Sequence, residues 1–136
     1  MQWLLIAILA FDLASIKNEP NLEKRSELAL DHAGAELDEA REAYNAGDVA
    51  KMESALGEVG ESVELAYHSL TDTGKDARRN PKFFKRAELR TRELMRRLEG
   101  IRESVSYQDR ALVEVVRDRV AEVHDELLKG IMSKKK

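Results

Sequence analysis

Four stretches of the chain carry apolar or small side chains at steps of three or four residues, the spacing that places them on one face of an α-helix. They cover residues 22–44, 49–70, 83–105 and 112–131. In the second stretch the steps alternate strictly between three and four, a repeat that suits left-handed packing of neighbouring helices. The third stripe consists of Phe83, Ala87, Thr91, Leu94, Leu98, Ile101 and Val105, and the fourth of Leu112, Val116, Val120, Val123, Leu127 and Ile131.

Residues that end and start helices separate these stretches. Gly47 favours a left-handed stop, and Asp48 is a suitable N-cap for the next helix. Asn80-Pro81 predicts the start of the third helix. Ser106 and the acidic residue three positions later have the spacing of a capping box for the fourth.

Helices of matched length with short connections predict an all-α fold, an antiparallel up-down-up-down four-helix bundle over residues 20–136. Each helix is expected to be about 35–39 Å long. The composition agrees, because 43% apolar residues can fill one core and no stretch alternates as a strand does. Gly57 and Gly60 in the second helix should allow a neighbour to approach closely.

The segment Ala43-Tyr44-Asn45-Ala46-Gly47-Asp48 resembles the turn between the paired helices of a tetratricopeptide repeat. The family's repeat of about 34 residues does not recur, and Met52 stands where its small alanine is expected. The plain interpretation is an αα-hairpin with a Gly-Asp turn.

Residues 1–16 form an apolar N-terminal segment that we expect to be a signal peptide. The run from Trp3 to Phe11 is too short to span a bilayer as a helix, but it fits the apolar part of an export signal. The best cleavage motifs would cut after Ala10 or after Ser15. An uncleaved anchor and a segment packed on the bundle remain as alternatives.

Charge is strongly segregated along the chain, whose net charge is −3. Residues 22–72 hold 13 acidic and 4 basic side chains, whereas residues 75–102 hold 11 basic and 4 acidic ones. The candidate binding residues for an anionic partner lie at the start of the third helix: Arg78, Arg79, Lys82, Lys85, Arg86 and Arg90. The competing interpretation is that these charges compensate the acidic helices within the bundle.

No pattern indicates catalysis, a metal site or a cofactor. The chain has no cysteine, and no glycine-rich phosphate loop or serine nucleophile motif. The three histidines, His32, His68 and His124, flank the stripes and lack the Glu-x-x-His spacing of di-iron bundles. Glu36 lies one turn after His32 and Glu64 one turn before His68, so carboxylate–imidazole pairs are possible; a weak metal site is the alternative to plain surface histidines.

The sequence therefore predicts a non-catalytic binding or scaffolding module, exported to the periplasm or secreted, with a protein partner or self-association. The alternative is a cytoplasmic protein that binds nucleic acid or another anionic partner through the basic third helix and the Lys134–Lys136 tail. No transmembrane span is expected.

Overall fold

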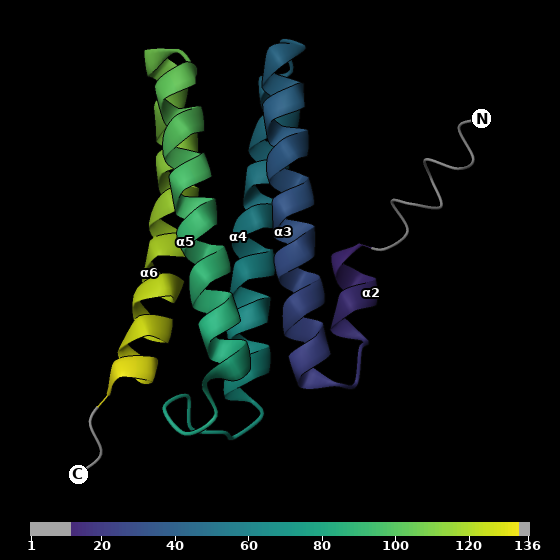
Figure 1. Cartoon of the computed structure of the whole chain (residues 1–136). Coiled ribbons are helices and arrows are strands. Elements are labelled where there is room, and N and C mark those ends of the chain that lie inside the picture. Colours follow the sequence, from purple (N-terminus) through teal and green to yellow (C-terminus); the bar gives the residue numbers. More distant parts are fainter. Residues whose placement is uncertain (1–11, 134–136) are drawn as a thin grey trace.

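A computed structural model describes residues 12–133 and contains four long helices that pack side by side (Figure 1). They are α3 (Leu22–Asn45), α4 (Val49–Thr71), α5 (Pro81–Ser104) and α6 (Arg110–Met132). A short helix, α2 (Leu13–Lys17), precedes them, and a 3₁₀ turn, η1 (Tyr107–Asp109), joins α5 to α6. The predicted all-α four-helix bundle, with helix direction alternating along the chain, is confirmed.

The α3–α4 hairpin forms as its sequence predicts. Gly47 adopts a positive φ of 82°, where a side chain would be strained, and ends the turn after α3. The Asp48 carboxylate accepts a hydrogen bond of 3.0 Å from the backbone N–H of Lys51 at the start of α4. At the other end of α3, the Asn21 side chain caps the N–H of Lys24 at 3.0 Å.

The predicted capping box before the fourth helix is wrong. The Ser106 hydroxyl donates to a carboxylate oxygen of Asp109 at 2.8 Å, and it makes no capping bond to a backbone N–H. The backbone N–H of Ser106 donates to the Tyr44 hydroxyl at 2.8 Å, which ties the α5–α6 connection to the end of α3. Asn80 does occupy the N-cap position of α5, but its side chain makes no capping bond.

The order of the helices around the bundle differs from their order in sequence. α3 packs against α4 and α5, and α6 packs against α5 and α4. The bundle is thus two antiparallel hairpins laid side by side, with α3 next to α5 and α4 next to α6 (Figure 1). Each long helix has one antiparallel and one parallel neighbour, and residues 72–80 connect α4 to α5 across the end of the bundle.

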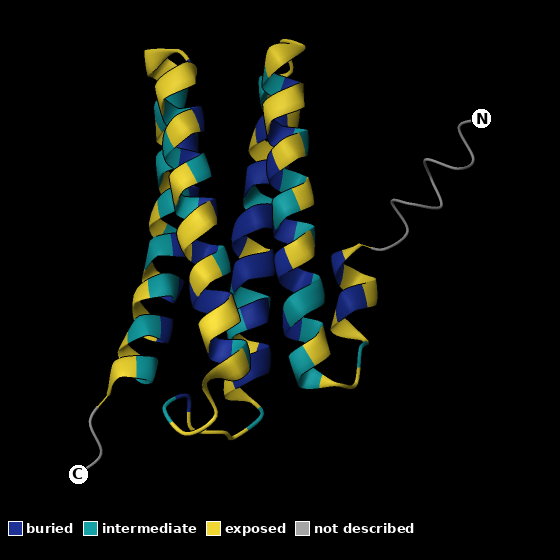
Figure 2. Cartoon of the chain, in the orientation of Figure 1, coloured by how far each residue is buried: buried dark blue, intermediate teal, exposed yellow. Residues whose placement is uncertain are grey.

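The core lies between the four helices, and buried positions line their inward faces (Figure 2). Two stripe positions were predicted wrongly. Phe84 is buried at 6% exposure and Phe83 only partly buried, and Val113 is fully buried where Leu112 is not. Phe84 and Val113 continue the strict three–four alternation of their helices, which is the geometry of this packing.

The glycines of α4 differ in their surroundings. A Cβ at Gly60 would lie 2.6 Å from a guanidinium nitrogen of Arg119 on α6, so Gly60 permits this close approach. Nothing lies within 4 Å of a Cβ at Gly57, where the expected close neighbour is missing.

The short helix α2 packs on the outside of α3 (Figure 1). Its Ile16 is 1% exposed and belongs to the main core, and Leu13 is also buried. The Asp12 carboxylate caps the helix by accepting from the N–H of Ser15 at 3.0 Å. Most of the predicted export signal, residues 1–11, lies outside the described residues, as does the 134–136 tail. No helix within residues 12–133 has the length and apolarity needed to cross a bilayer.

Candidate binding surface along α3 and α5

A row of ion pairs joins acidic α3 to basic α5 and the loop before it. We call it the α3–α5 ladder, and it consists of Glu23–Lys75, Glu27–Arg86, Asp31–Arg90 and Asp38–Arg97. The three pairs within the helices each span 59 residues, a constant separation that requires α3 and α5 to run parallel. The Lys75 and Arg90 pairs measure 2.9 and 2.8 Å.

The ladder neutralises part of the basic surface predicted as a binding site. Arg86 and Arg90 belong to it, so two of the six candidate residues contact acids of α3. These pairs are largely exposed, and each contributes about 0–1 kcal/mol to stability. Their effect is mainly to cancel the charge of this face rather than to hold the helices together.

The other four candidate residues stay largely uncompensated at the α4–α5 end of the bundle. Arg79 reaches only Asp76 of its own loop, at 3.9 Å. Within residues 12–133, the side chains of Arg78, Lys82 and Lys85 have no ion-pair partner. These four residues, Arg78, Arg79, Lys82 and Lys85, are called the basic end below.

A groove of about 380 Å³ lies next to the basic end, between α3 and α5. It is lined by Ser26, Glu27, Leu30, Phe83, Arg86, Leu89 and Arg90. Leu89 is 53% exposed. The Lys82 ammonium and the Arg86 guanidinium lie 5.3 and 5.6 Å from the centre of the Phe83 ring. The groove therefore combines apolar side chains with the paired charges of Glu27, Arg86 and Arg90.

Sequence reasoning missed this groove because it assigned Phe83 to the core and did not single out Leu89. The available signal was the strict three–four alternation of α5, which selects Phe84 for the core and leaves Phe83 and Leu89 off the stripe. The partner helix could not be read from the sequence, because the α3–α5 contact depends on how the two hairpins are placed.

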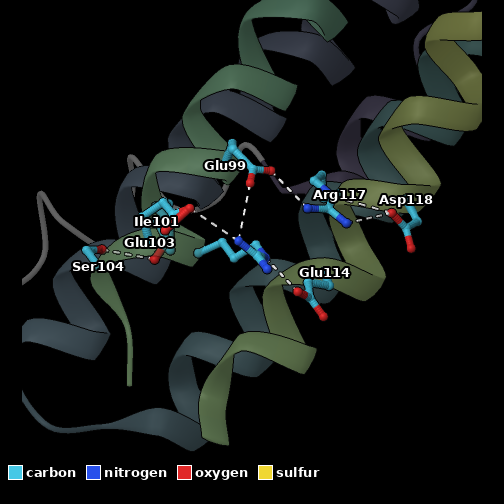
Figure 3. A network of polar contacts seen from close by, with 8 residues as sticks. Glu99, Ile101, Glu103, Ser104, Glu114, Arg117 and Asp118 are labelled. Carbon is cyan, nitrogen blue, oxygen red and sulfur yellow. Dashed lines mark hydrogen bonds and ion pairs between the residues drawn. The ribbon is translucent and has the colours of Figure 1, made fainter. Parts of the chain in front are cut away.

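The contacts between α5 and α6 are also dominated by arginine and carboxylate pairs (Figure 3). Arg117 of α6 donates to Glu99 of α5 at 2.9 Å, and Arg102 of α5 donates to Glu114 of α6 at 2.5 Å. Between α4 and α6, Arg119 holds Glu64 through two hydrogen bonds of 3.1 and 2.8 Å. The side-chain hydrogen bond from Arg119 is the main reason that the pKa of Glu64 is lowered.

One carboxylate is buried between α5 and α6. Glu88 is 4% exposed, lies 2.8 Å from His124 Nε2, and accepts from Arg92 at 3.0 and 2.5 Å. Burial raises the pKa of Glu88, but the hydrogen bonds from His124 and Arg92 outweigh it and leave the pKa lowered. The group is a compensated structural contact, since one carboxylate meets one guanidinium.

A second histidine, His32, has a different environment on the α3–α4 hairpin. Its Nε2 lies 3.1 Å from Glu58 Oε1, and Glu36 completes a group whose ligand-type atoms all lie within 4.8 Å of one another. Sequence spacing had paired His32 with Glu36 only. The hairpin register supplies Glu58, as it supplies the Glu39–Lys51 pair, which lies seven residues after His32 on α3 and seven residues before Glu58 on α4.

Comparisons with known proteins give no relative for this chain: no family model, no curated protein and no solved structure matches it.

Proposed function

We propose that the chain is a non-catalytic binding module that holds a partner protein in the groove between α3 and α5. The observation that carries the proposal is the half-exposed Leu89 beside Phe83 in the groove between α3 and α5, with the Lys82 and Arg86 cations over the Phe83 ring. An exposed apolar surface next to polar residues is typical of protein interaction sites. The partner that fits is a segment with an apolar side chain flanked by acidic residues.

The charge distribution supports this choice of partner. The α3–α5 ladder already neutralises the arginines on one wall of the groove, so that wall offers little net charge to a polyanion. The basic end remains available, and Lys82 lies over the Phe83 ring at the groove itself. An apolar anchor would bind between the helices while its acidic flanks contact the basic end, where complementary charge sets orientation and association rate.

Site-specific photo-crosslinking in the native host tests the proposal. A benzophenone amino acid at Leu89 should give one protein adduct, and the same probe at Val115, an equally exposed apolar position on α6, should give none. The crosslinked segment should contain an apolar residue flanked by Asp or Glu. A synthetic peptide of that segment should bind the purified protein and lose at least tenfold in affinity with Leu89→Ser.

The charge contribution is tested with matched reversals on α5. Lys82→Glu with Lys85→Glu should remove the adduct, whereas Arg96→Glu, an exposed arginine further along the same helix, should leave it. Equal adducts from Leu89 and Val115, no adduct at Leu89, or an adduct indifferent to the Lys82 and Lys85 reversals would contradict the proposal.

A second candidate function is binding of nucleic acid or another polyanion, and the unpaired side chains of the basic end favour it. Such binding should weaken steeply with salt, because phosphate contacts release counterions. Replacing the four residues of the basic end by Gln should then abolish retention on DNA or heparin near physiological salt. Retention that survives this variant would refute the second candidate.

We also propose that the module acts outside the cytoplasm, on the strength of the apolar run from Trp3 to Phe11. The burial of Leu13 and Ile16 favours cleavage after Ala10, which keeps α2, over cleavage after Ser15, which removes Leu13 from the bundle. Mass spectrometry of the native protein should find a mature chain that begins at Phe11. An intact Met1 in a cytoplasmic fraction would contradict export.

A further inference from the structure

The group formed by His32, Glu36 and Glu58 has the ligand types and the geometry of a metal site. His32 and Glu36 lie one turn apart on α3, and Glu58 faces them from α4. One imidazole nitrogen and two carboxylates thus converge from two helices, with all ligand-type atoms within 4.8 Å of one another. Ligands around a tetrahedral zinc ion at its usual bond lengths lie about 3.4 Å apart.

The carboxylates of this partly buried group pair with no arginine or lysine in the described part of the chain, in contrast to the carboxylate that contacts His124. At Glu88 a guanidinium balances the carboxylate. Glu58 has only His32 as a partner, and Glu36 has no hydrogen bond or ion pair within the described part of the chain. Within residues 12–133 no arginine or lysine forms an ion pair with Glu36 or Glu58, and a divalent cation would supply the positive charge that these carboxylates lack.

Other acidic residues near the group favour the binding of a cation. Burial is the main reason that the pKa of Glu36 is raised, and the nearby Glu58 and Glu39 raise it further, while His32 and Lys51 act in the opposite direction. Residues 22–72 carry nine more acids than bases, and the α3–α5 ladder engages only four of those acids. The hairpin therefore keeps a negative field that concentrates cations.

We propose that His32, Glu36 and Glu58 bind a divalent transition metal ion, with zinc as the ion that best fits one nitrogen and two carboxylate ligands. Three protein ligands leave the fourth position for water. The bound ion would link α3 to α4 near the middle of both helices. It would also remove the repulsion between the carboxylates of Glu36 and Glu58, because both would coordinate the same ion. This inference stands independently of the proposed partner-binding function, because the groove lies between α3 and α5.

Titration of the tag-free, chelator-treated protein with zinc sulfate, followed by calorimetry and by thermal unfolding, tests the site. We expect one ion per chain and a rise in Tm with zinc concentration, as binding to the folded state requires. Cobalt(II) should give the visible absorption of a low-coordinate site.

The variants His32→Gln, Glu36→Gln and Glu58→Gln should each weaken zinc binding at least tenfold. The matched controls are His68→Gln and Glu53→Gln, which change an exposed histidine and an exposed glutamate of α4 and should leave the affinity unchanged. Circular dichroism and thermal unfolding without metal establish that each variant folds. Since Glu36 makes no hydrogen bond within the described chain, its variant is the least disturbing to the fold.

Three results would overturn the proposal. They are the absence of zinc binding at millimolar concentration, binding that survives His32→Gln and Glu36→Gln, and binding lost equally in the His68→Gln control.

Discussion

The buried carboxylate of Glu88 provides the sharpest test of how α5 and α6 are held together. In Glu88→Ala the Nε2 of His124 loses its 2.8 Å partner, while its Nδ1 already has no hydrogen bond in the described structure. The imidazole, whose side chain is 12% exposed, then keeps only the 3.6 Å contact of Nδ1 with the exposed carboxylate of Asp125. We expect a loss of about 3 kcal/mol in the free energy of unfolding, the range for breaking a buried pair by removing one partner. Glu88→Gln keeps the shape and one acceptor, so we expect a loss of about 1–2 kcal/mol.

The assay is urea unfolding followed by circular dichroism at pH 7 and at pH 3. Because the folded pKa of Glu88 is lowered below the ordinary value of 4.5, its stabilising contribution is present above that value and is lost as the pH falls through the folded pKa. The stability difference between the natural protein and Glu88→Gln should therefore shrink at pH 3. Glu93→Gln, at an exposed position on the same helix, is the control and should change stability by less than about 0.5 kcal/mol.

Two outcomes would refute this reasoning. A Glu88→Gln variant as stable as the Glu93→Gln control would mean that the buried pair is not formed. A stability difference that is the same at pH 7 and pH 3 would mean that the effect comes from shape and not from the charge.

Three further predictions concern the bundle as a whole. Leu98→Asp should lower the free energy of unfolding by several kcal/mol, because it buries an unpaired carboxylate. Glu39→Ala should change that free energy by less than about 1 kcal/mol. Equal effects of the two variants in urea unfolding would show that the buried faces of the helices are assigned wrongly. Gly57→Ala should raise the free energy of unfolding by about 0.5–1 kcal/mol, because alanine has the higher helix propensity. Gly60→Ala should gain less, because its Cβ would displace the Arg119 guanidinium of α6. A larger gain at Gly60 would argue against the close contact between α4 and α6. A chain without residues 1–19 should still unfold cooperatively, at a lower Tm because α2 no longer contributes Ile16 to the core. Non-cooperative melting would show that the bundle needs this segment to fold.

The helices themselves follow from the sequence because their determinants are local. The three–four spacing of apolar residues, the positive φ available to Gly47 and the carboxylate of Asp48 act within one or two turns of the chain, and all appear in the structure as expected. The same local rule, applied strictly, would also have chosen Phe84 and Val113 for the core. Those two errors came from accepting irregular steps at helix starts, where the stripe is least defined.

The candidate sites depend on placement that no local rule supplies. The four helices could follow one another around the bundle in sequence order, or stand with α3 beside α5 as they do in the structure. Both arrangements bury the same four apolar stripes, so the hydrophobic pattern does not distinguish them. The connection of residues 72–80 is long enough to cross the end of the bundle and place α5 beside α3. In that position Arg86 and Arg90 pair with acids of α3, whereas the residues of the basic end do not. Glu58 joins His32 only because the α3–α4 hairpin fixes its register. The sequence determined which residues are helical and which face inward, since these are short-range effects. The tertiary structure decided which charged side chains meet, because those contacts join positions far apart in the chain.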